Sequence, residues 1–575
     1  MEVAKSNSIA PETLLAFLLN PDSYPHRPKR VYLKQTHSSY VLLAAPYAYK
    51  VKKPVNFGFL DFSTLEKRRY FCEREILLNR RFCTRIHLGV VPISLREGKL
   101  TFGPGDAIVE YAVKMRKLAD RYFMLALLKK DQIGTKELDR LVSTLKTFYE
   151  AQHPTAEIVE WGRIENLKIS TDENFRQTEN FVGFTISRPA FETIRFYTDR
   201  FYLKNGALFE DRIRENRIRD CHGDLHLEHI HITSKAISIY DCIEFNDRFR
   251  YTDVANDVAF LAMDLDFQGR PDLSRQFTAK IINALNDPEM ECLMDFYKCY
   301  RAYVRGKVET FHQNVSGLPA DKRSEIRARA ERYFRLALQY AICGSKPIVL
   351  IIMGRVASGK STLAKALARE LGWNLFSSDP IRKQLAGVPL YERPEPAARS
   401  QLYSKTMTEK TYNALRANAI AQVETQRSLI LDATFSNRRH REELVNQLGA
   451  LGVDYCFVET KASEEILKTR LVKREVKLNE VSDARIEDFD LLTRSYETPA
   501  EVGPDHLITV STDSPLEATV VETLKKLACI AHKSLDQPAT LRVAMRAGIC
   551  ERCRLRQGQH DCPAQPDNHV ALFPE

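Results

Sequence analysis

The stretch from residue 348 to residue 371 constrains this chain more than any other part of its sequence. It joins an apolar run, a glycine-containing loop and a helix-forming segment in direct succession, and the loop reads Gly354-Arg355-Val356-Ala357-Ser358-Gly359-Lys360-Ser361. A loop of this kind turns its backbone N–H groups toward phosphate oxygens, and the helix that follows adds a favourable dipole. We therefore expect a strand over 348–353, a helix over 362–371 and a phosphate-binding loop between them.

Two side chains of this loop would contact a bound nucleoside triphosphate directly. The Lys360 amine would reach the β- and γ-phosphates, and the Ser361 hydroxyl would hold Mg²⁺. The sequence therefore predicts that this part of the chain binds ATP and Mg²⁺. The predicted nucleotide-binding residues are those of the loop and the position after it: Gly354, Arg355, Val356, Ala357, Ser358, Gly359, Lys360, Ser361 and Thr362.

Two carboxylates follow the next predicted strands of this half. Asp379 comes after an expected strand at 374–376, where it could accept the proton of a substrate hydroxyl while Arg382 binds an anionic substrate group. Asp432 ends an apolar strand at 428–431 and could orient Mg²⁺ through water. Each carboxylate has a simpler alternative, because Asp379 could cap the following helix and Asp432 could be a turn residue.

Residues 346–530 alternate strands and helices, which predicts a parallel sheet covered by helices on both faces. Together with the loop and the two carboxylates, they resemble the small P-loop kinases of the polynucleotide kinase, gluconate kinase and zeta-toxin group. Arg470 and Arg474 share one helix face and resemble lid arginines that close over the transferring phosphate, although a solvated basic face is the alternative. The acceptor stays open, because those kinases phosphorylate nucleic-acid ends, sugars or nucleotide sugars.

A second set of motifs lies in the first half of the chain, where a small mixed lobe precedes a helical one. Its segments are Cys221-His222-Gly223-Asp224, Ile237-Ser238-Ile239-Tyr240-Asp241 and Asp253-Val254-Ala255-Asn256-Asp257. They resemble the aminoglycoside phosphotransferase and choline kinase-like family, whose fold is that of protein kinases. The resemblance implies that Asp224 positions the acceptor hydroxyl, that Asp241 binds Mg²⁺, and that Asp257 supports the catalytic loop.

Upstream residues extend the same resemblance. Lys50 would be the phosphate-binding lysine, with Lys52 as the reserve, and Glu75 would be its partner on the following helix. The segment 109–112 would be the hinge against the adenine. Exposed surface charge is the alternative for Lys50 and Glu75.

Two positions depart from the family pattern. The usual Asn, five residues after the catalytic Asp, is His229 here, and Mg²⁺ prefers oxygen ligands to an imidazole. Glu228 or water could substitute, or metal binding could be weaker. The expected phosphate-covering hairpin at 36–40 contains no glycine. The stretch 49–62 and the motifs downstream of it together resemble bacterial proteins that fuse an aminoglycoside phosphotransferase-like domain to a P-loop domain, over about residues 10–530.

The predicted domains are a kinase-like domain at 1–312, a helical connector at 313–345, a P-loop kinase domain at 346–530 and a cysteine-bearing tail at 531–575. The fold class is therefore α/β and α+β: a bilobal protein-kinase-like domain followed by a parallel-sheet domain. The tail could bind Zn²⁺, although a redox or iron–sulfur arrangement and the absence of any metal are alternatives. Its candidate ligands are Cys550, Cys553, His560 and Cys562.

The charge balance of the chain is mildly basic. It has 85 Lys and Arg residues against 75 Asp and Glu, for a net charge of +10 over 575 residues. This excess suits phosphate-bearing ligands. It does not indicate a nucleic-acid protein, in which basic residues are usually concentrated on one face. The longest apolar run is far shorter than the ~20 residues of a membrane span, and the N-terminus lacks the apolar core of a secretory signal. We expect a cytoplasmic protein with no membrane partner.

These patterns lead to one principal hypothesis and two alternatives. The principal one is a bifunctional ATP-dependent phosphotransferase, in which each half transfers a γ-phosphate to a hydroxyl of a small molecule. In the first alternative one half is a degenerate, ATP-sensing module, and His229 favours the N-terminal half for that role. In the second, the C-terminal half is a polynucleotide 5′-hydroxyl kinase. The sequence leaves the oligomeric state open.

Overall fold

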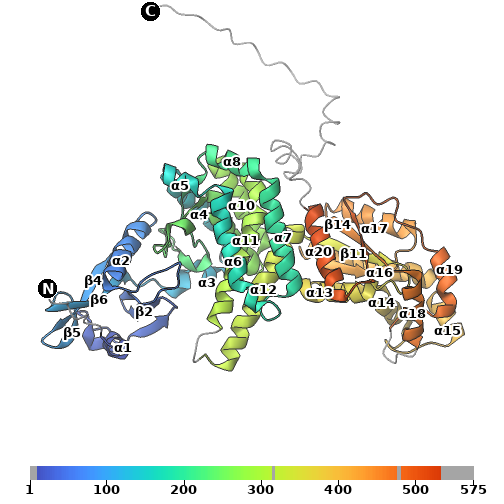
Figure 1. Cartoon of the computed structure of the whole chain (residues 1–575), viewed down its shortest axis with the longest axis horizontal. Helices are drawn as coiled ribbons and strands as arrows, with labels where there is room; N and C mark the ends of the chain where they lie inside the picture. The colour runs from blue at the N-terminus through green and yellow to red at the C-terminus, as the bar shows by residue number, and fades with distance from the viewer. Residues whose placement is uncertain (1–8, 314–317, 476–480, 532–575) are drawn as a thin grey trace, which may run out of the picture.

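The structure is a computed structural model that describes residues 9–313, 318–475 and 481–531. Three bodies follow one another along the chain: a small sheet-containing lobe, a helical lobe and an α/β domain (Figure 1). The predicted tail ligands Cys550, Cys553, His560 and Cys562 lie outside the described residues. None of the helices in the described ranges is both long and apolar enough to cross a membrane.

The small lobe is built on a six-stranded antiparallel sheet in the order β1-β2-β3-β6-β4-β5. Within this sheet β2 and β3 pair antiparallel, with Val41 opposite Lys50. Helix α2 packs on this sheet against β4 and β6, and its N-terminus is capped by the Thr64 hydroxyl. The elements are α1 (Pro11–Leu19), β1 (Tyr32–Gln35), β2 (Ser39–Ala44), β3 (Tyr47–Lys52), α2 (Leu65–Arg80), β4 (His87–Arg96), β5 (Lys99–Phe102) and β6 (Ala107–Arg116).

The helical lobe surrounds two short antiparallel strand pairs, β7 with β10 and β8 with β9. Apolar residues at three- and four-residue spacing place one face of α4 in the core of the helical lobe that the sequence predicts, and α9 is buried along nearly its whole length. The helices are α3 (Met124–Leu128), α4 (Thr135–Glu150), α5 (Ala156–Glu160), α6 (Ile164–Thr178), α7 (Arg188–Lys204), α8 (Gly206–Arg214), α9 (Val254–Phe267), α10 (Pro271–Leu285) and α11 (Met290–His312). The strands are β7 (Ile218–Asp220), β8 (Ile230–Ile232), β9 (Ile237–Ile239) and β10 (Tyr251–Asp253).

The C-terminal domain contains the predicted parallel sheet, with five strands in the order β12-β13-β11-β14-β15. The central strand β11 is buried at every position, which explains its uninterrupted apolar sequence. The strands are β11 (Ile348–Gly354), β12 (Asn374–Ser377), β13 (Leu429–Asp432), β14 (Asp454–Lys461) and β15 (Leu507–Ser511). The helices are α13 (Lys360–Leu371), α14 (Ser378–Ala386), α15 (Pro396–Leu402), α16 (Lys405–Glu424), α17 (Arg438–Ala450), α18 (Glu464–Glu475), α19 (Phe489–Arg494) and α20 (Leu516–Ala531).

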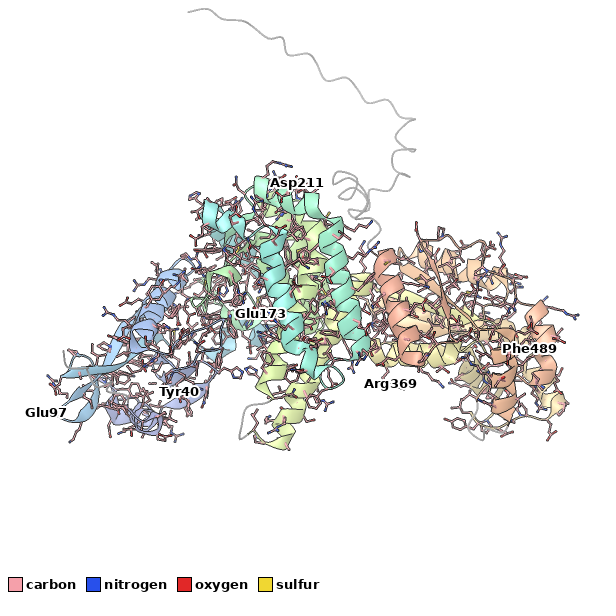
Figure 2. The ribbon with its side chains drawn as sticks, in the orientation of Figure 1. Tyr40, Glu97, Glu173, Asp211, Arg369 and Phe489 are labelled. Atoms are coloured by element: carbon pink, nitrogen blue, oxygen red, sulfur yellow. The ribbon has the colours of Figure 1, made fainter. Side chains whose placement is uncertain are left out.

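Helix α12 (Ala320–Cys343), expected as a connector, is packed on both sides rather than extended through solvent. It lies along α11 and also contacts α7, α13 and α20. One continuous apolar core therefore runs from the helical lobe into the P-loop domain, and it includes Phe334, Leu338, Leu367 and Leu524. Side chains fill this junction, where Arg369 of α13 also lies (Figure 2).

Candidate functional site

The phosphate loop lies between the C-terminal end of β11 and the first turn of α13. Gly354 has φ +145°, and a Cβ at this position would lie 2.6 Å from the carbonyl oxygen of Thr460, so this position requires glycine. Two hydrogen bonds from other parts of the domain hold the loop. The hydroxyls of Ser358 and Thr460 are 2.6 Å apart, and the Thr512 hydroxyl donates to the Ser358 carbonyl at 2.7 Å. The loop conformation is therefore fixed by the domain around it.

A cavity of about 440 Å³ opens over this loop. Arg470, from α18, donates to the carbonyls of Ala357 and Thr512, so this predicted lid arginine is tied to the loop itself. Lys365, Lys473 and Thr512 also line the cavity and were missed by the motif search. The predicted residues that the structure brings together here are Gly359, Lys360, Ser361, Thr362, Asp379, Asp432, Arg470 and Arg474.

Burial changes the ionisation of two opposite charges in this cavity, Lys360 and Asp432. Burial lowers the pKa of Lys360 and raises the pKa of Asp432, although each partly offsets the shift of the other. Asp432 Oδ1 is buried and has no hydrogen-bond partner among the described residues. An orphaned carboxylate oxygen beside the Ser361 hydroxyl is an all-oxygen donor set, so these residues fit Mg²⁺.

Arg382 lies elsewhere. Its side chain is buried against α15 and α16, with the guanidinium 4.7 Å from the centre of the Tyr403 ring. It donates to the Leu402 carbonyl at 3.2 Å and to the Thr408 hydroxyl at 3.1 Å. Arg382 is not among the residues that line the cavity, whereas its predicted partner Asp379 is.

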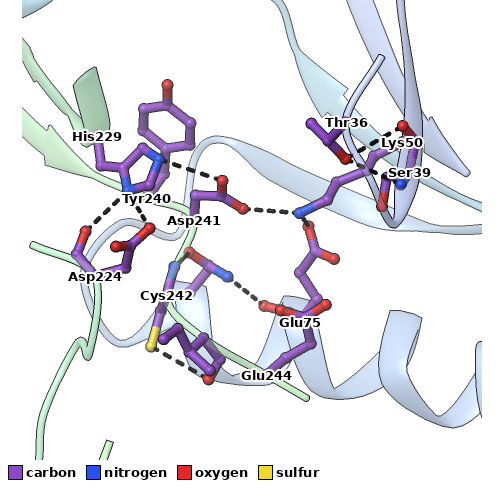
Figure 3. A network of polar contacts seen from close by, with 12 residues as sticks. Thr36, Ser39, Lys50, Glu75, Asp224, His229, Tyr240, Asp241, Cys242 and Glu244 are labelled. Carbon is purple, nitrogen blue, oxygen red and sulfur yellow. Dashed lines mark hydrogen bonds and ion pairs between the residues drawn. The ribbon is translucent and has the colours of Figure 1, made fainter. Parts of the chain in front are cut away.

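In the N-terminal half, Lys50 lies between two carboxylates (Figure 3). Its amine is 2.8 Å from Asp241 Oδ1 and 3.1 Å from Glu75 Oε1. Lys52 points the same way but is fully buried, where it pairs with Glu244 and with Glu75 Oε2 at 2.7 Å. Burial alone would raise the pKa of Glu75, but the two lysines outweigh it and lower that pKa to about 2. Of these two lysines, Lys50 is the one that lines a second cavity, between the two N-terminal lobes.

The loop that carries Asp224 is held from beneath by Asp257 of α9. The Asp257 carboxylate accepts hydrogen bonds from the Tyr149 hydroxyl at 2.9 Å and from the backbone N–H groups of His222 and Gly223 at 3.0 and 2.9 Å. Burial would raise the pKa of Asp224, but the nearby His226, His229 and Arg305 outweigh it and lower that pKa. Asp224 is therefore ionised at neutral pH.

His229 lies between Asp224 and Asp241 (Figure 3). Its Nδ1 lies 2.9 Å from the Asp224 carbonyl oxygen, and its Nε2 lies 3.4 Å from Asp241 Oδ2. Burial and the neighbouring His226 lower the pKa of His229. The metal-facing donors are therefore one oxygen and one nitrogen, a set that does not fit Mg²⁺.

A cavity of about 550 Å³ separates the two N-terminal lobes and includes Lys50, Glu75, Asp224 and Asp241. The predicted glycine-free hairpin, 36–39, forms part of its wall. The expected hinge at 109–112 is wrong, because these residues lie inside β6 and the strand continues to Arg116. Part of the cavity wall is aromatic, which no sequence motif indicates, and it includes Phe57, Phe59, Phe245, Phe249 and Phe311.

The loop, the parallel sheet and the cavity above them define the C-terminal part of the chain as a P-loop domain of the kinase type. In agreement, the AAA domain family model matches residues 349–499. Uncharacterized protein Rv2004c of Mycobacterium tuberculosis (strain ATCC 25618 / H37Rv) is 31% identical over 409 residues, which cover 71% of this chain and 79% of that protein. This chain belongs to the family of Rv2004c.

Other relatives and solved structures match a smaller share of this chain. A Xenopus tropicalis protein named probable gluconokinase is 29% identical over 136 residues, or 22% of this chain and 69% of its own length. Shikimate kinase of Moorella thermoacetica is 26% identical over 82 residues, or 14% of this chain and 42% of that enzyme. The crystal structure of a gluconokinase from Sinorhizobium meliloti 1021 is 21% identical and covers 32% of this chain and 94% of its own, with a TM-score of 0.24.

Proposed function

We propose that the C-terminal domain is an ATP-dependent kinase that phosphorylates a hydroxyl group of a small molecule. The observation that carries this proposal is the gathering of Lys360, Ser361, Asp379 and Asp432 around one cavity above the phosphate loop. The similarity to proteins named gluconokinase and shikimate kinase supports the same reaction class.

Each residue has a distinct part in this reaction. The Lys360 amine binds the β- and γ-phosphates, Asp379 accepts the proton of the acceptor hydroxyl, and Arg474 neutralises charge on the transferring phosphoryl group. Mg²⁺, when bound by Ser361 and Asp432, would supply charge neutralisation between the phosphates. Arg382 has no direct part, because its guanidinium is engaged by Leu402 and Thr408.

The test is phosphotransfer from ATP to a pool of metabolites, followed by mass spectrometry of the products. Lys360→Ala and Asp379→Asn should each remove the product of this domain. Asp454→Asn, at an exposed strand start of the same sheet, is the matched control and should leave it unchanged. Retention of the product in Asp379→Asn would overturn the assignment of the base. Phosphorylation of oligonucleotide 5′ ends instead of metabolites would favour the polynucleotide alternative.

We also propose that the N-terminal half, with predicted boundaries 1–312, is a protein-kinase-like nucleotide site. The contacts of Lys50 with Glu75 and Asp241, and the support of the Asp224 loop by Asp257, favour this function. Lys50 would bind phosphates and Asp224 would orient an acceptor hydroxyl. Because His229 stands where the family usually has Asn, the alternative that this half only senses ATP is retained.

The two versions of the N-terminal function differ in turnover. If this half is a second phosphotransferase, Asp224→Asn should abolish a product that survives in Lys360→Ala. If it is an ATP-sensing module, Lys360→Ala should retain ATP binding at one site, measured by calorimetry, while all phosphorylated products disappear. Loss of all ATP binding in Lys360→Ala would contradict both versions.

A further inference from the structure

We propose that the two nucleotide sites of this chain select different cations: the P-loop site takes Mg²⁺, whereas the N-terminal site takes a nitrogen-accepting divalent ion such as Mn²⁺, Co²⁺ or Zn²⁺ between His229 and Asp241. The inference rests on the proposed nucleotide-binding function of the N-terminal half. It follows from the donor atoms of the two sites and from the way in which His229 is held.

The first step is the orientation of the His229 ring. Its Nδ1 lies 2.9 Å from the backbone carbonyl oxygen of Asp224, and a carbonyl can only accept, so Nδ1 carries the hydrogen. In the neutral ring, Nε2 then presents a lone pair. Metal-binding histidines in proteins are commonly fixed in this way, with one ring N–H donated to a carbonyl and the other nitrogen turned to the metal.

The second step is the atom that this lone pair faces. Nε2 lies 3.4 Å from Asp241 Oδ2, so two electron-pair donors point at each other across a short gap. Hydrogen bonds between a charged N–H and a carboxylate measure about 2.7–2.9 Å, so 3.4 Å is too long for one. Two ligands about 2.0–2.2 Å from one ion, at angles of about 90–110°, lie about 2.8–3.6 Å apart. The gap therefore suits a cation bound by both atoms.

The third step is the availability of the Asp241 oxygen. Lys50 binds Oδ1 at 2.8 Å, so Oδ2 is the oxygen turned to His229. The Asp241 side chain is 40% exposed and lines the interlobe cavity, where a nucleotide phosphate could complete the coordination. An ion at this point would thus bridge a protein carboxylate, an imidazole and the ligand.

The fourth step is the contrast with the P-loop site of the same chain. There the candidate donors are the Ser361 hydroxyl and the unpartnered Oδ1 of Asp432, which are both oxygen. Mg²⁺ is a hard ion that takes oxygen ligands, whereas an imidazole nitrogen favours Mn²⁺, Co²⁺ or Zn²⁺ over it. Two sites in one chain would therefore respond to different metals.

The test uses the full chain with its P-loop site disabled by Lys360→Ala and Ser361→Ala together. Mn²⁺ and ADP are added, and pulsed electron paramagnetic resonance detects directly whether a nitrogen coordinates the Mn²⁺. We expect a nitrogen signal, and competition by Mg²⁺ should need at least ~10-fold higher concentration than Mn²⁺. His229→Asn should abolish the nitrogen signal and lower that ratio toward one.

His226→Asn is the matched control. The His226 ring lies 3.9 Å from the His229 ring and is tilted by 38° to it, but its Nδ1 accepts the Glu228 backbone N–H, so its loss should leave the nitrogen signal in place. Absence of the signal in the parent protein, or its persistence in His229→Asn, would overturn the proposal. If the parent binds no ADP, the proposed N-terminal function fails. The metal site is then judged with Mn²⁺ alone, where the nitrogen signal must appear and must vanish in His229→Asn.

Discussion

Replacement of Asp257 by asparagine should weaken the support beneath the Asp224 loop. One oxygen of Asp257 accepts the Tyr149 hydroxyl and the His222 N–H, and the other accepts the Gly223 N–H. Asparagine keeps one oxygen and replaces the other by an NH₂ group. Whichever way this amide turns, at least one backbone N–H of the loop faces a donor and loses its acceptor.

The cost follows from the burial of this contact. Asp257, His222 and Gly223 are buried, so water cannot replace the lost acceptor. A buried N–H without a partner costs about 1–3 kcal/mol, and the loss of the negative charge weakens the remaining hydrogen bonds by about 1 kcal/mol. We therefore expect Asp257→Asn to lower the free energy of unfolding of the helical lobe by about 2–4 kcal/mol.

Urea unfolding can measure this effect locally, because the chain has two tryptophans and they lie in different halves, Trp161 and Trp373. With Trp373→Phe as the background, the tryptophan fluorescence comes from Trp161 in the helical lobe. Tyr149→Phe is the matched control: it removes one donor, leaves both backbone hydrogen bonds intact and should cost about 1 kcal/mol. A cost of Asp257→Asn no greater than that of Tyr149→Phe would refute the reasoning.

Three further changes test other parts of the structure. Gly354→Ala would place a Cβ 2.6 Å from the Thr460 carbonyl oxygen. The ATP affinity of the P-loop site, measured by calorimetry, should therefore fall at least ~10-fold. An unchanged affinity would show that the loop tolerates a side chain. Burial lowers the pKa of Lys307 to about 8 from its ordinary 10.5. Between these two pH values the unfolded chain binds more protons than the folded chain, so the free energy of unfolding should rise with pH, by at most about 3 kcal/mol. Lys307→Met should remove this rise, measured as the difference in urea midpoint between pH 7.5 and pH 10, and an equal rise in both proteins would contradict the assignment. Phe334→Ala at the junction should cost about 3–5 kcal/mol and shift the unfolding of Trp161 and Trp373 together, whereas a shift of one tryptophan alone would show that the halves unfold separately.

The parts of the molecule that carry local motifs could be predicted from the sequence. A phosphate loop needs its glycines, lysine and hydroxyl residue in adjacent positions, so Lys360 and Ser361 were found together with the strand before them and the helix after them. Residues around Asp224 and Asp241 were found for the same reason, since each motif sits at the end of a short strand. In such cases the chemistry and the local fold depend on the same few neighbouring residues.

Other features depend on contacts between distant parts of the chain. Arg382 is three residues from Asp379, but only the packing of α14 on α16 decides that its guanidinium faces inward. The segment 109–112 is apolar enough for either a hinge or a strand, and its pairing with β3 and β4 makes it a strand. The direct approach of His229 to Asp241 likewise needs β8 and β9 to pair, which brings residues 229 and 241 side by side.

The continuous core around α12 has a consequence for how such a chain can be inherited. Recombination that separated the two halves would leave Phe334 and Leu338 on one fragment and Leu367 and Leu524, which belong to the same apolar core, on the other. Both fragments would then expose an apolar face and tend to aggregate. The solubility of each half would therefore depend on the presence of the other, so the two halves are expected to be inherited together as a single gene.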